Sequence, residues 1–488
     1  MRLEIRRQQG ALQDAAPSMT PRTAPRTPSL TAAPWHQGTR AAVIHRGRIW
    51  DYDELTARVS ARAAALSEQG LRTGQVVLAC DSSGPDLVVT QFALGRLNAA
   101  MCPCDPAQSP ERRAALIAGA GIEWQLIEHQ AAPPRLRSTG TCRESDGEPA
   151  GSLALIVETS GSQGTPKAAM LTPASIVASS TLVNRHLALG PGDRWLACLP
   201  RHHVGGLSIG YRCALAGATL VVWDGFVVDR QLYRALDTHR ITHVSMVPAM
   251  LARLLSLGSP PRHLRVLLIG GQALHPSLME QALAAGWPLH VTYGMTETFS
   301  QVATSTRLRS TPAPGVIAPP LPHIEIDAAR NDEPPRRLRI RGPVVMAGYA
   351  NRAREPGHGL DQGWFATSDL GRWSADGQIR VIGRADEALV IAGTQVYPQQ
   401  IEARLSRAPG VTTAAVVAVP DPAWGHTLAV AYTGPVEPTV LADWCRLNLA
   451  SPERPRRVER WEKLPLLASG KQDRRRIERR FLADNAED

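Results

Sequence analysis

Lysine is nearly missing from this sequence of 488 residues. Of its 54 cationic side chains only three are lysines, at positions 167, 463 and 471, and the others are arginines. The arginines behind the net charge of +10 are scattered, so the charge does not indicate a nucleic-acid partner. Lys167 and Lys471 both lie in glycine-containing loops. This indicates sites that need a compact ammonium group, which a forked guanidinium cannot replace.

Long apolar runs and regularly spaced cysteines are also missing. No segment approaches the roughly 18 apolar residues of a membrane span, so we expect no membrane insertion. Seven irregularly spaced cysteines argue against a disulfide framework and fit a reducing, cytoplasmic location. Cys102 and Cys104 form a lone CxC, which we interpret as buried thiols rather than a metal site. Residues 1–38 have no apolar core of a signal peptide, and we expect a disordered extension.

The length and the pattern of the chain predict an α/β protein with more than one domain. One hydrophobic core seldom supports 488 residues. Residues 41–128 alternate between strand and helix patterns, as in a parallel sheet. Residues 129–151 are rich in Pro, Arg, Ser and Gly, and they predict an exposed connection. Residues 335–382 look β-rich, with a hairpin turn at Asp376-Gly377.

The segment 157–167, VETSGSQGTPK, predicts a phosphate-binding loop directly after an apolar strand. Gly161 and Gly164 allow backbone N–H groups to converge, Lys167 adds a charge, and an ordinary Gly/Ser hairpin is the alternative. It is not the loop of P-loop NTPases, because Pro166 precedes the lysine and a strand, not a helix, follows. Hydroxyl donors in the loop are Thr159, Ser160, Ser162 and Thr165.

This loop resembles the phosphate loop of the adenylate-forming superfamily, which includes acyl-CoA synthetases, luciferases and the adenylation domains of peptide synthetases. Further motifs follow in the family's order: YGMTE at 293–297, an aspartate at 369, GRADE at 383–387 and a lysine at 471. The resemblance covers nearly all of the chain after about residue 40. It implies a large domain (39–384) of layered α/β subdomains with a small β-barrel-like part, a hinge (385–388) and a small mobile α/β domain (389–488).

The resemblance also implies roles for individual residues at the nucleotide. Tyr293 would stack on adenine, Thr296 would contact phosphate, and Glu297 would hold Mg²⁺, since a hard cation prefers carboxylate oxygen. For Asp369 the alternative is an aspartate that opens a surface turn. Other contacts that the family pattern implies are Gly271, Gln272 and Gly294 at the adenine, and Asp369 and Arg384 at the ribose and phosphate.

Two strings indicate the acid substrate. HHVGGLS resembles the acyl-pocket motif, in which His203 lines the route to the carboxylate; a structural histidine is the alternative. Arg212 lies in an otherwise apolar helix, where a buried cation needs a negative partner unless it snorkels to the surface. With TETFSQ, which contains Ser300, these strings are similar to o-succinylbenzoate–CoA ligases of menaquinone biosynthesis. Their substrate is a keto acid with two carboxylates.

The resemblance implies an ATP-dependent acid–CoA ligase that uses ATP, Mg²⁺ and coenzyme A and passes through an acyl-AMP. Lys167 and Lys471 would be catalytic, Asp386 the hinge, and Gly393 part of the channel for the pantetheine arm. Gln163 departs from the family pattern, because a threonine is usual there. Alternatives are another acyl- or aryl-CoA synthetase, a stand-alone adenylation enzyme, or an inactive binding protein of the same fold. The oligomeric state stays open, a homodimer included.

Overall fold

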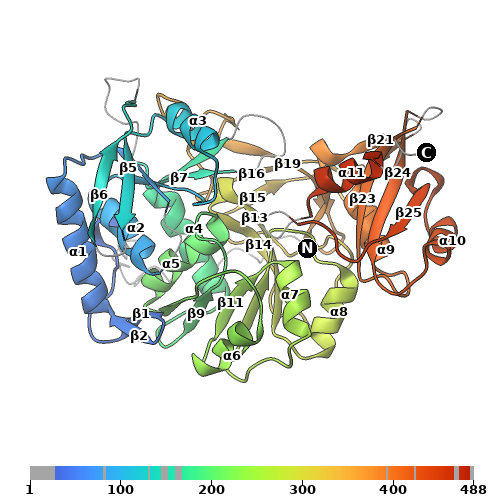
Figure 1. The fold of residues 1–488 in the computed structure, drawn as a ribbon, viewed down its shortest axis with the longest axis horizontal. Coiled ribbons are helices and arrows are strands. Elements are labelled where there is room, and N and C mark those ends of the chain that lie inside the picture. The colour runs from blue at the N-terminus through green and yellow to red at the C-terminus, as the bar shows by residue number, and fades with distance from the viewer. Residues whose placement is uncertain are drawn as a thin grey trace, which may run out of the picture.

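The computed structural model has two lobes, a large one and a small one (Figure 1). The described part contains five β-sheets with helices packed on their faces, so the α/β class predicted from the sequence is confirmed. The ranges that the structure describes are 28–80, 84–129, 132–143, 152–159, 167–391, 394–421, 425–466 and 472–483.

The largest sheet has eight strands in the order β14-β13-β12-β11-β9-β10-β1-β2. Its inner strands are parallel, and β14 and β2 pair antiparallel at the two edges. Ligands of such sheets bind at the carboxyl ends of the parallel strands. The strands are β1 (Ala41–His45), β2 (Arg48–Asp51), β9 (Arg194–Ala197), β10 (Thr219–Val222), β11 (His243–Met246), β12 (Val266–Ile269), β13 (Leu289–Met295) and β14 (Ser300–Thr304).

The second sheet has seven strands in the order β17-β8-β7-β4-β3-β5-β6. The prediction that 129–151 is only a connection was wrong in part, because Ala132–Ser138 forms β6 at the sheet's edge, where prolines are tolerated. The other strands are β3 (Val76–Ala79), β4 (Ala100–Pro103), β5 (Trp124–His129), β7 (Leu155–Glu158), β8 (Ala168–Leu171) and β17 (Gly348–Tyr349).

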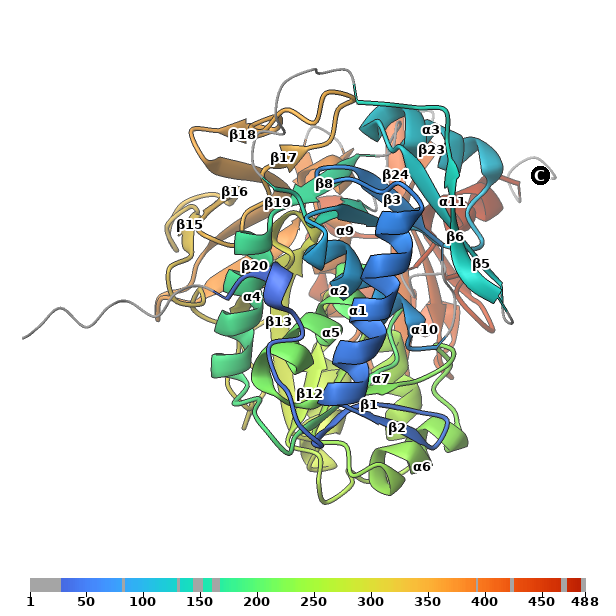
Figure 2. The ribbon, with the colours of Figure 1, turned by 90° about the vertical axis from the view of Figure 1, so that its left-hand side faces the viewer.

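Four helices lie in one layer between these two sheets, as Figure 2 shows. They share a hydrophobic core with strands of both sheets. A second core packs α6, α7 and α8 on the outer face of the eight-stranded sheet, and α3 covers the outer face of the other. The inner helices are α1 (Tyr52–Glu68), α2 (Asp86–Arg96), α4 (Pro173–His186) and α5 (Val204–Ala216). The outer helices are α3 (Pro110–Ala120), α6 (Arg230–Thr238), α7 (Pro248–Leu255) and α8 (Pro276–Ala284).

A five-stranded antiparallel sheet completes the large lobe, with the predicted hairpin turn at Asp376-Gly377, where Gly377 has φ +76°. The hairpin's second strand, β20, leads into the short 3-10 helix η3 (Ala385–Glu387), which connects to the small lobe. The strands of this sheet are β15 (Glu325–Asp327), β16 (Arg336–Arg341), β18 (Leu360–Asp361), β19 (Trp364–Trp373) and β20 (Ile379–Arg384).

The small lobe is built on a three-stranded sheet. Because side chains alternate along a strand, one face packs on α9 and α10 and the other on α11. None of the helices in the described ranges is both long and apolar enough to cross a membrane. The elements are β21 (Leu389–Ile391), β22 (Thr394–Val396), α9 (Pro398–Leu405), β23 (Thr413–Asp421), β24 (Gly425–Thr433), α10 (Pro438–Asn448), η4 (Ser451–Glu453), β25 (Arg457–Arg460) and α11 (Arg474–Ala483).

The start of the chain differs from the predicted extension over 1–38. Leu30 and Ala33 are buried, in and just after the 3-10 helix η1 (Leu30–Ala32), and Arg96 of α2 donates to the carbonyl of Ala33 at 2.9 Å. This part of the segment therefore packs on the large lobe, because the apolar side chains of Leu30 and Ala33 are buried beside α2. Disorder stays a prediction for residues 1–27, which lie outside the described ranges.

Candidate active site

A tight turn between β13 and β14 positions the YGMTE string at the carboxyl end of β13. The 3-10 helix η2 (Thr296–Thr298) carries Thr296 and Glu297, and β14 begins at Ser300. A Cβ at Gly294 would lie 1.8 Å from the carbonyl oxygen of Ser300, so only glycine fits there. Phe299 (φ 53°) and Ser300 (φ 140°) have positive φ values that are strained for residues with a side chain. The turn thus holds Glu297 and Ser300 close together.

Glu297 is held by a residue that the sequence analysis missed. Tyr349 donates a hydrogen bond from Oη to Glu297 Oε1 at 2.7 Å. The ammonium of Lys167 lies 5.1 Å from the centroid of the same ring. Tyr349 comes next to the site because β17 pairs with β8, which directly follows Lys167. Tyr349 therefore links the predicted metal ligand to the predicted phosphate-binding lysine. Its only signal in the sequence was a tyrosine in a predicted β-rich segment.

The surroundings of Glu297 suit a hard cation. Burial raises the pKa of its carboxyl group, and the hydrogen bond from Tyr349 and the charge of Arg384 act in the opposite direction. A bound cation would replace the proton that this environment favours. The described residues contain no group of three or more His, Cys, Asp or Glu that could hold a metal. Mg²⁺ is usually bound through one or two carboxylates together with the phosphates of the substrate, and Glu297 could supply one such carboxylate.

Tyr293 and Asp369 contact each other. Tyr293 donates from Oη to Asp369 Oδ2 at 2.7 Å, and burial together with that carboxylate raises the pKa of the phenol. Asp369 is the cross-strand neighbour of Arg384 in the β19–β20 pair. Arg384 in turn donates two hydrogen bonds to Asp386, at 2.9 and 2.7 Å. The two residues expected at adenine and ribose are therefore brought together, and the predicted hinge is bonded to the same group.

Arg212 is buried on α5, with only 1% of its surface exposed, so it does not snorkel to the surface. Its Nη2 donates to Ser300 Oγ at 2.9 Å, and its guanidinium carbon lies 5.3 Å from the centre of the Trp195 ring. Its Nε is buried without a partner, and no acidic side chain in the described ranges is bonded to it. Burial lowers the pKa of the guanidinium to about 9. The cation that the sequence indicated is thus buried without a counter-charge.

Further unpartnered polar groups lie on the two helices around Arg212. Ser208 precedes Arg212 by one helical turn on α5, and Ser180 precedes Asn184 by one turn on α4, so each pair shares a helix face. The side-chain oxygens of all three residues are buried without a partner in the described structure. Asn184 Nδ2 donates to the backbone carbonyl of Arg212 at 2.9 Å, which ties the two faces together. Polar residues spaced by four in apolar helices were the signal that sequence reasoning missed.

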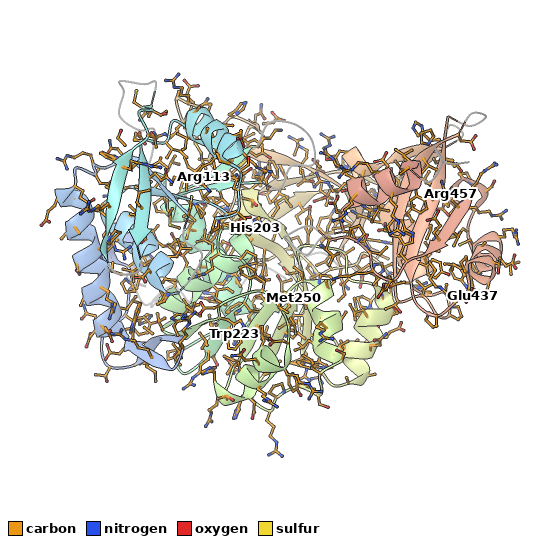
Figure 3. The ribbon with its side chains drawn as sticks, in the orientation of Figure 1. Arg113, His203, Trp223, Met250, Glu437 and Arg457 are labelled. Atoms are coloured by element: carbon orange, nitrogen blue, oxygen red, sulfur yellow. The ribbon has the colours of Figure 1, made fainter. Side chains whose placement is uncertain are left out.

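His203 stands immediately before the first turn of α5, near the middle of the molecule (Figure 3). Its ring centre is 4.4 Å from that of His202, whose Nε2 lies 3.8 Å from Asp105 Oδ2. Burial lowers the pKa of His202. A Cβ at Gly206 would lie 2.5 Å from the carbonyl oxygen of Pro200, so the small residues of HHVGG let the helix begin against the preceding backbone. His203 thereby lies at the start of the helix that carries Arg212.

Several predicted site residues lie outside the described ranges: Ser160, Gly161, Ser162, Gly164, Thr165, Gly393 and Lys471. Their roles stay predictions. The base of the phosphate loop is described, and there the backbone N–H of Thr159 donates to the carbonyl of Lys167 at 2.8 Å. Gly271 has φ +78°, and the Nε2 of Gln272 is buried without a partner in the described structure.

The predicted hinge is also connected to the start of α11. Glu387 of η3 accepts from Gln399 Nε2 at 3.1 Å, and its carboxylate lies 3.7 Å from the guanidinium of Arg474. Arg474 donates two hydrogen bonds to the buried Glu402, at 2.6 and 2.8 Å. Arg474 stands three residues beyond Lys471 in the sequence. A rotation at the hinge would therefore move the start of α11 with the small lobe.

Comparison with known proteins agrees with this geometry. The family model "AMP-binding enzyme" matches residues 30–350, and the model of its C-terminal domain matches residues 400–471. The chain belongs to the AMP-binding, adenylate-forming enzymes. The resemblance inferred from the motifs is therefore confirmed, as is the expected architecture of layered α/β subdomains with a curled half-barrel and a C-terminal domain.

Relatives of this adenylate-forming enzyme include CoA ligases. It is 33% identical over 332 residues to a 2-succinylbenzoate–CoA ligase of Bacillus mycoides, which covers 66% of this chain and 69% of that one. Identity to the Bacillus pumilus ligase is 28% over 478 residues, covering 92% and 96%. The o-succinylbenzoate CoA synthetase of Bacillus subtilis, solved with its acyl-adenylate, superposes with a TM-score of 0.79 at 25% identity, covering 92% and 98%. The chain is thus an adenylate-forming acid–CoA ligase.

Proposed function

We propose that this ligase activates o-succinylbenzoate, or a dicarboxylic acid of the same shape, and joins it to coenzyme A in menaquinone biosynthesis. The observation that carries the proposal is Arg212, a buried guanidinium without a carboxylate partner in the described structure. A buried cation is unfavourable unless a negative group meets it. A second carboxylate on the acid would supply that group, while the first carboxylate reacts.

The first half-reaction joins the acid to AMP. A carboxylate oxygen attacks the α-phosphorus of ATP, the bond to the bridging oxygen breaks, and pyrophosphate leaves. Lys167, Thr296 and Lys471 are proposed to stabilise the charge that spreads over the phosphates. Mg²⁺ held by Glu297 would add charge neutralisation at the same phosphates. Tyr349 contacts both Glu297 and Lys167, so it positions them relative to each other.

The nucleoside is proposed to bind between β13 and the β19–β20 pair. Tyr293 would stack on adenine beside Gly271 and Gln272, while Asp369 accepts hydrogen bonds from the ribose hydroxyls. In the structure Asp369 accepts from Tyr293 at 2.7 Å, so this carboxylate is already oriented by a neighbouring donor. Arg384 stands next to Asp369 and completes the group.

The second half-reaction displaces AMP with the thiol of coenzyme A. The thiol gives its proton to water, its sulfur attacks the acyl carbon, and AMP leaves with the electron pair of the acyl–oxygen bond. We propose that the small lobe rotates about Asp386 between the two steps, bringing Lys471 to the phosphates first and the channel at Gly393 afterwards. Glu387 and Arg474 couple this hinge to the segment after Lys471.

The test of the substrate is a panel of carboxylic acids in a pyrophosphate-release assay, with and without coenzyme A. We expect o-succinylbenzoate to be preferred over benzoate. Arg212→Ala should raise the KM for o-succinylbenzoate about 30- to 700-fold, corresponding to about 2–4 kcal/mol for a broken charge pair. The matched control Arg185→Ala removes an exposed arginine from the facing helix α4 and should leave KM unchanged.

Other outcomes of this assay assign other functions. An equal loss for o-succinylbenzoate and benzoate in Arg212→Ala would remove Arg212 from substrate recognition. A preference for a monocarboxylic acid would indicate another acyl- or aryl-CoA synthetase. Pyrophosphate release without a CoA thioester would indicate a stand-alone adenylation enzyme, and no release with any acid would indicate an inactive binding protein.

Asp386→Pro tests the proposed rotation. Proline fixes φ near −65°, so thioester formation from added acyl-AMP should fall sharply, while acyl-AMP formation survives. The substitution also removes two hydrogen bonds from Arg384. Asp386→Ala removes the same carboxylate without fixing the backbone, and it is the control. Equal thioester rates in both variants would contradict a hinge at this position.

A further inference from the structure

Two cysteines lie side by side where β3 and β4 end. These strands are parallel neighbours, and their last residues, Ala79 and Pro103, are register partners. Cys80 and Cys104 follow directly, and the N–H of Cys104 donates to the carbonyl of Ala79 at 2.9 Å. Neighbouring strands are about 4.8 Å apart, which falls within the range of about 4.4–6.8 Å that a disulfide requires between Cα atoms.

The two thiols also influence each other's ionisation. The interaction with Cys104 raises the pKa of Cys80, and the interaction with Cys80 lowers that of Cys104. The guanidinium of Arg113, on α3, also lowers the pKa of Cys104. Cys104 is therefore the member of the pair that loses its proton more readily, and its thiolate is the form that reacts with an oxidant, whereas its thiol form donates a hydrogen bond. Cys80 is partly exposed, so small oxidants can reach the pair.

A chain of hydrogen bonds leads from Cys104 to the base of the phosphate loop. The thiol of Cys104 donates to Gln108 Oε1 at 2.9 Å, and Gln108 Nε2 donates to Glu158 Oε2 at 2.6 Å. Arg112 Nε donates to the other oxygen of Glu158 at 2.7 Å. Glu158 is the last residue of β7, next to Thr159. The proton on Cys104 thus helps to hold the carboxylate that precedes the loop.

We propose that Cys80 and Cys104 form a reversible disulfide in the presence of a peroxide, and that this disulfide weakens ATP binding by removing support from Glu158, which directly precedes Thr159. The reaction balances in two steps. The thiolate of Cys104 attacks a peroxide oxygen and gives a sulfenic acid and hydroxide, which takes up a proton to become water. The sulfur of Cys80 then attacks the sulfenic sulfur, the S–O bond breaks, and a second water leaves. Two thiols lose two electrons, and the peroxide gains them.

The disulfide removes the thiol proton from Cys104. Gln108 Oε1 then loses its donor, and the amide is no longer fixed in the orientation that supports Glu158. Loss of one hydrogen bond in such a chain corresponds to an affinity for ATP that is about five- to tenfold weaker. A thiol reductant restores the donor and the affinity. This consequence rests on the proposed nucleotide site, whereas the disulfide itself does not.

The experiment treats the reduced full-length protein with hydrogen peroxide and locates disulfides by peptide mass spectrometry. The expected result is a linked pair of peptides containing Cys80 and Cys104, which dithiothreitol separates. Calorimetric titration with ATP and Mg²⁺ should show about five- to tenfold weaker binding after oxidation, with recovery after reduction. Binding is measured instead of turnover, so an unidentified acid substrate does not affect the result.

Variants separate this pair from the other thiols. Cys80→Ser and Cys104→Ser should both bind ATP normally while reduced, and neither can form the linked peptides. Cys104→Ser should also keep that affinity in peroxide, because serine retains a donor at position 104 and forms no sulfenic acid. Cys142→Ser removes an exposed cysteine and should respond like the parent protein. Gln108→Ala should weaken ATP binding of the reduced protein by a similar factor. The absence of the linked peptides, an unchanged affinity after they form, or a Cys142→Ser protein that no longer responds would each overturn the proposal.

Discussion

The two ends of the candidate active site satisfy their polar groups in opposite ways. At the end that we propose for the nucleotide, here called the nucleotide end, both carboxylates have a donor in the protein: Glu297 accepts from Tyr349, and Asp369 accepts from Tyr293. At the end that we propose for the acid, here called the acid end, Arg212 has an unpartnered Nε in the described structure, and side-chain oxygens of the facing helices are likewise buried there without partners. The first end is a group of mutually bonded side chains. The second is a set of polar atoms separated from water.

This difference teaches how the two substrates would be recognised. ATP carries many charged oxygens. The residues that bind them must exchange their present hydrogen-bond partners for these oxygens, so the net gain in binding free energy per contact is modest. The acid meets groups whose desolvation has already occurred on folding, so a fitting carboxylate recovers most of that energy. Selectivity for the acid is therefore expected to come from the buried end. Folding stability is expected to be lower because of it.

The largest effect is expected at the nucleotide end. Glu297→Gln keeps the shape of the side chain but removes its charge, so Mg²⁺-dependent pyrophosphate release should fall about 100-fold or more, by analogy with the removal of one group that stabilises transition-state charge. A magnesium titration of initial rates checks this. Glu355→Gln makes the same change at an exposed position and should have no effect. Equal magnesium curves for Glu297→Gln and the parent protein would remove Glu297 from the site.

At the acid end, we expect a substitution of Arg212 to change the free energy of unfolding. Arg212→Met replaces a buried charge without a counter-charge by an apolar chain, and we expect the free energy of unfolding to rise by about 1–3 kcal/mol. Denaturant titration measures it. The comparison is Arg354→Met, since Arg354 is also buried but bonds Glu123 and the carbonyls of Gly74 and Gly121. That variant should lose about 3–5 kcal/mol. Destabilisation of both variants by the same amount would show that Arg212 has a partner after all.

The smallest effect concerns pH. Burial raises the pKa of Glu297, while the hydrogen bond from Tyr349 lowers it. A proton competes with Mg²⁺ for this carboxylate, so activity should fall as the pH falls through the raised pKa. Tyr349→Phe removes the lowering contribution and should move this acid limb to higher pH. Profiles of kcat/KM against pH for both proteins check it, and superimposed profiles would contradict a link between Tyr349 and Glu297.

The local part of the site was readable from the sequence. YGMTE indicated Tyr293 and Glu297 as site residues, and the structure places them in β13 and in η2, which directly follows that strand. Position 294 requires glycine because the backbone of Ser300 lies close to it, and this requirement is visible in the sequence as the glycine of the motif. The α/β class followed from the alternation of strand and helix patterns. These features depend on neighbours in the chain, so a sequence pattern contains them.

Other features depend on contacts between distant segments. Tyr349 lies 52 residues from Glu297 and reaches it through the pairing of β17 with β8, for which no short pattern exists. The sequence left open whether the Arg212 side chain is buried or snorkels to the surface. The packing of α4 on α5 makes it buried. The strand β6 was hidden by its prolines, which an edge strand tolerates.

The backbone at Ser300 has a consequence for redesigning the enzyme. With φ at 140°, position 300 is strained for any residue other than glycine, and its carbonyl is packed against Gly294. Saturation mutagenesis at this position would therefore yield few folded variants, although its hydroxyl contacts Arg212. Libraries that aim at new acids should leave the turn intact. They should vary the helix faces of α4 and α5 instead, where exchanges of serine and asparagine alter polarity without a change in the backbone.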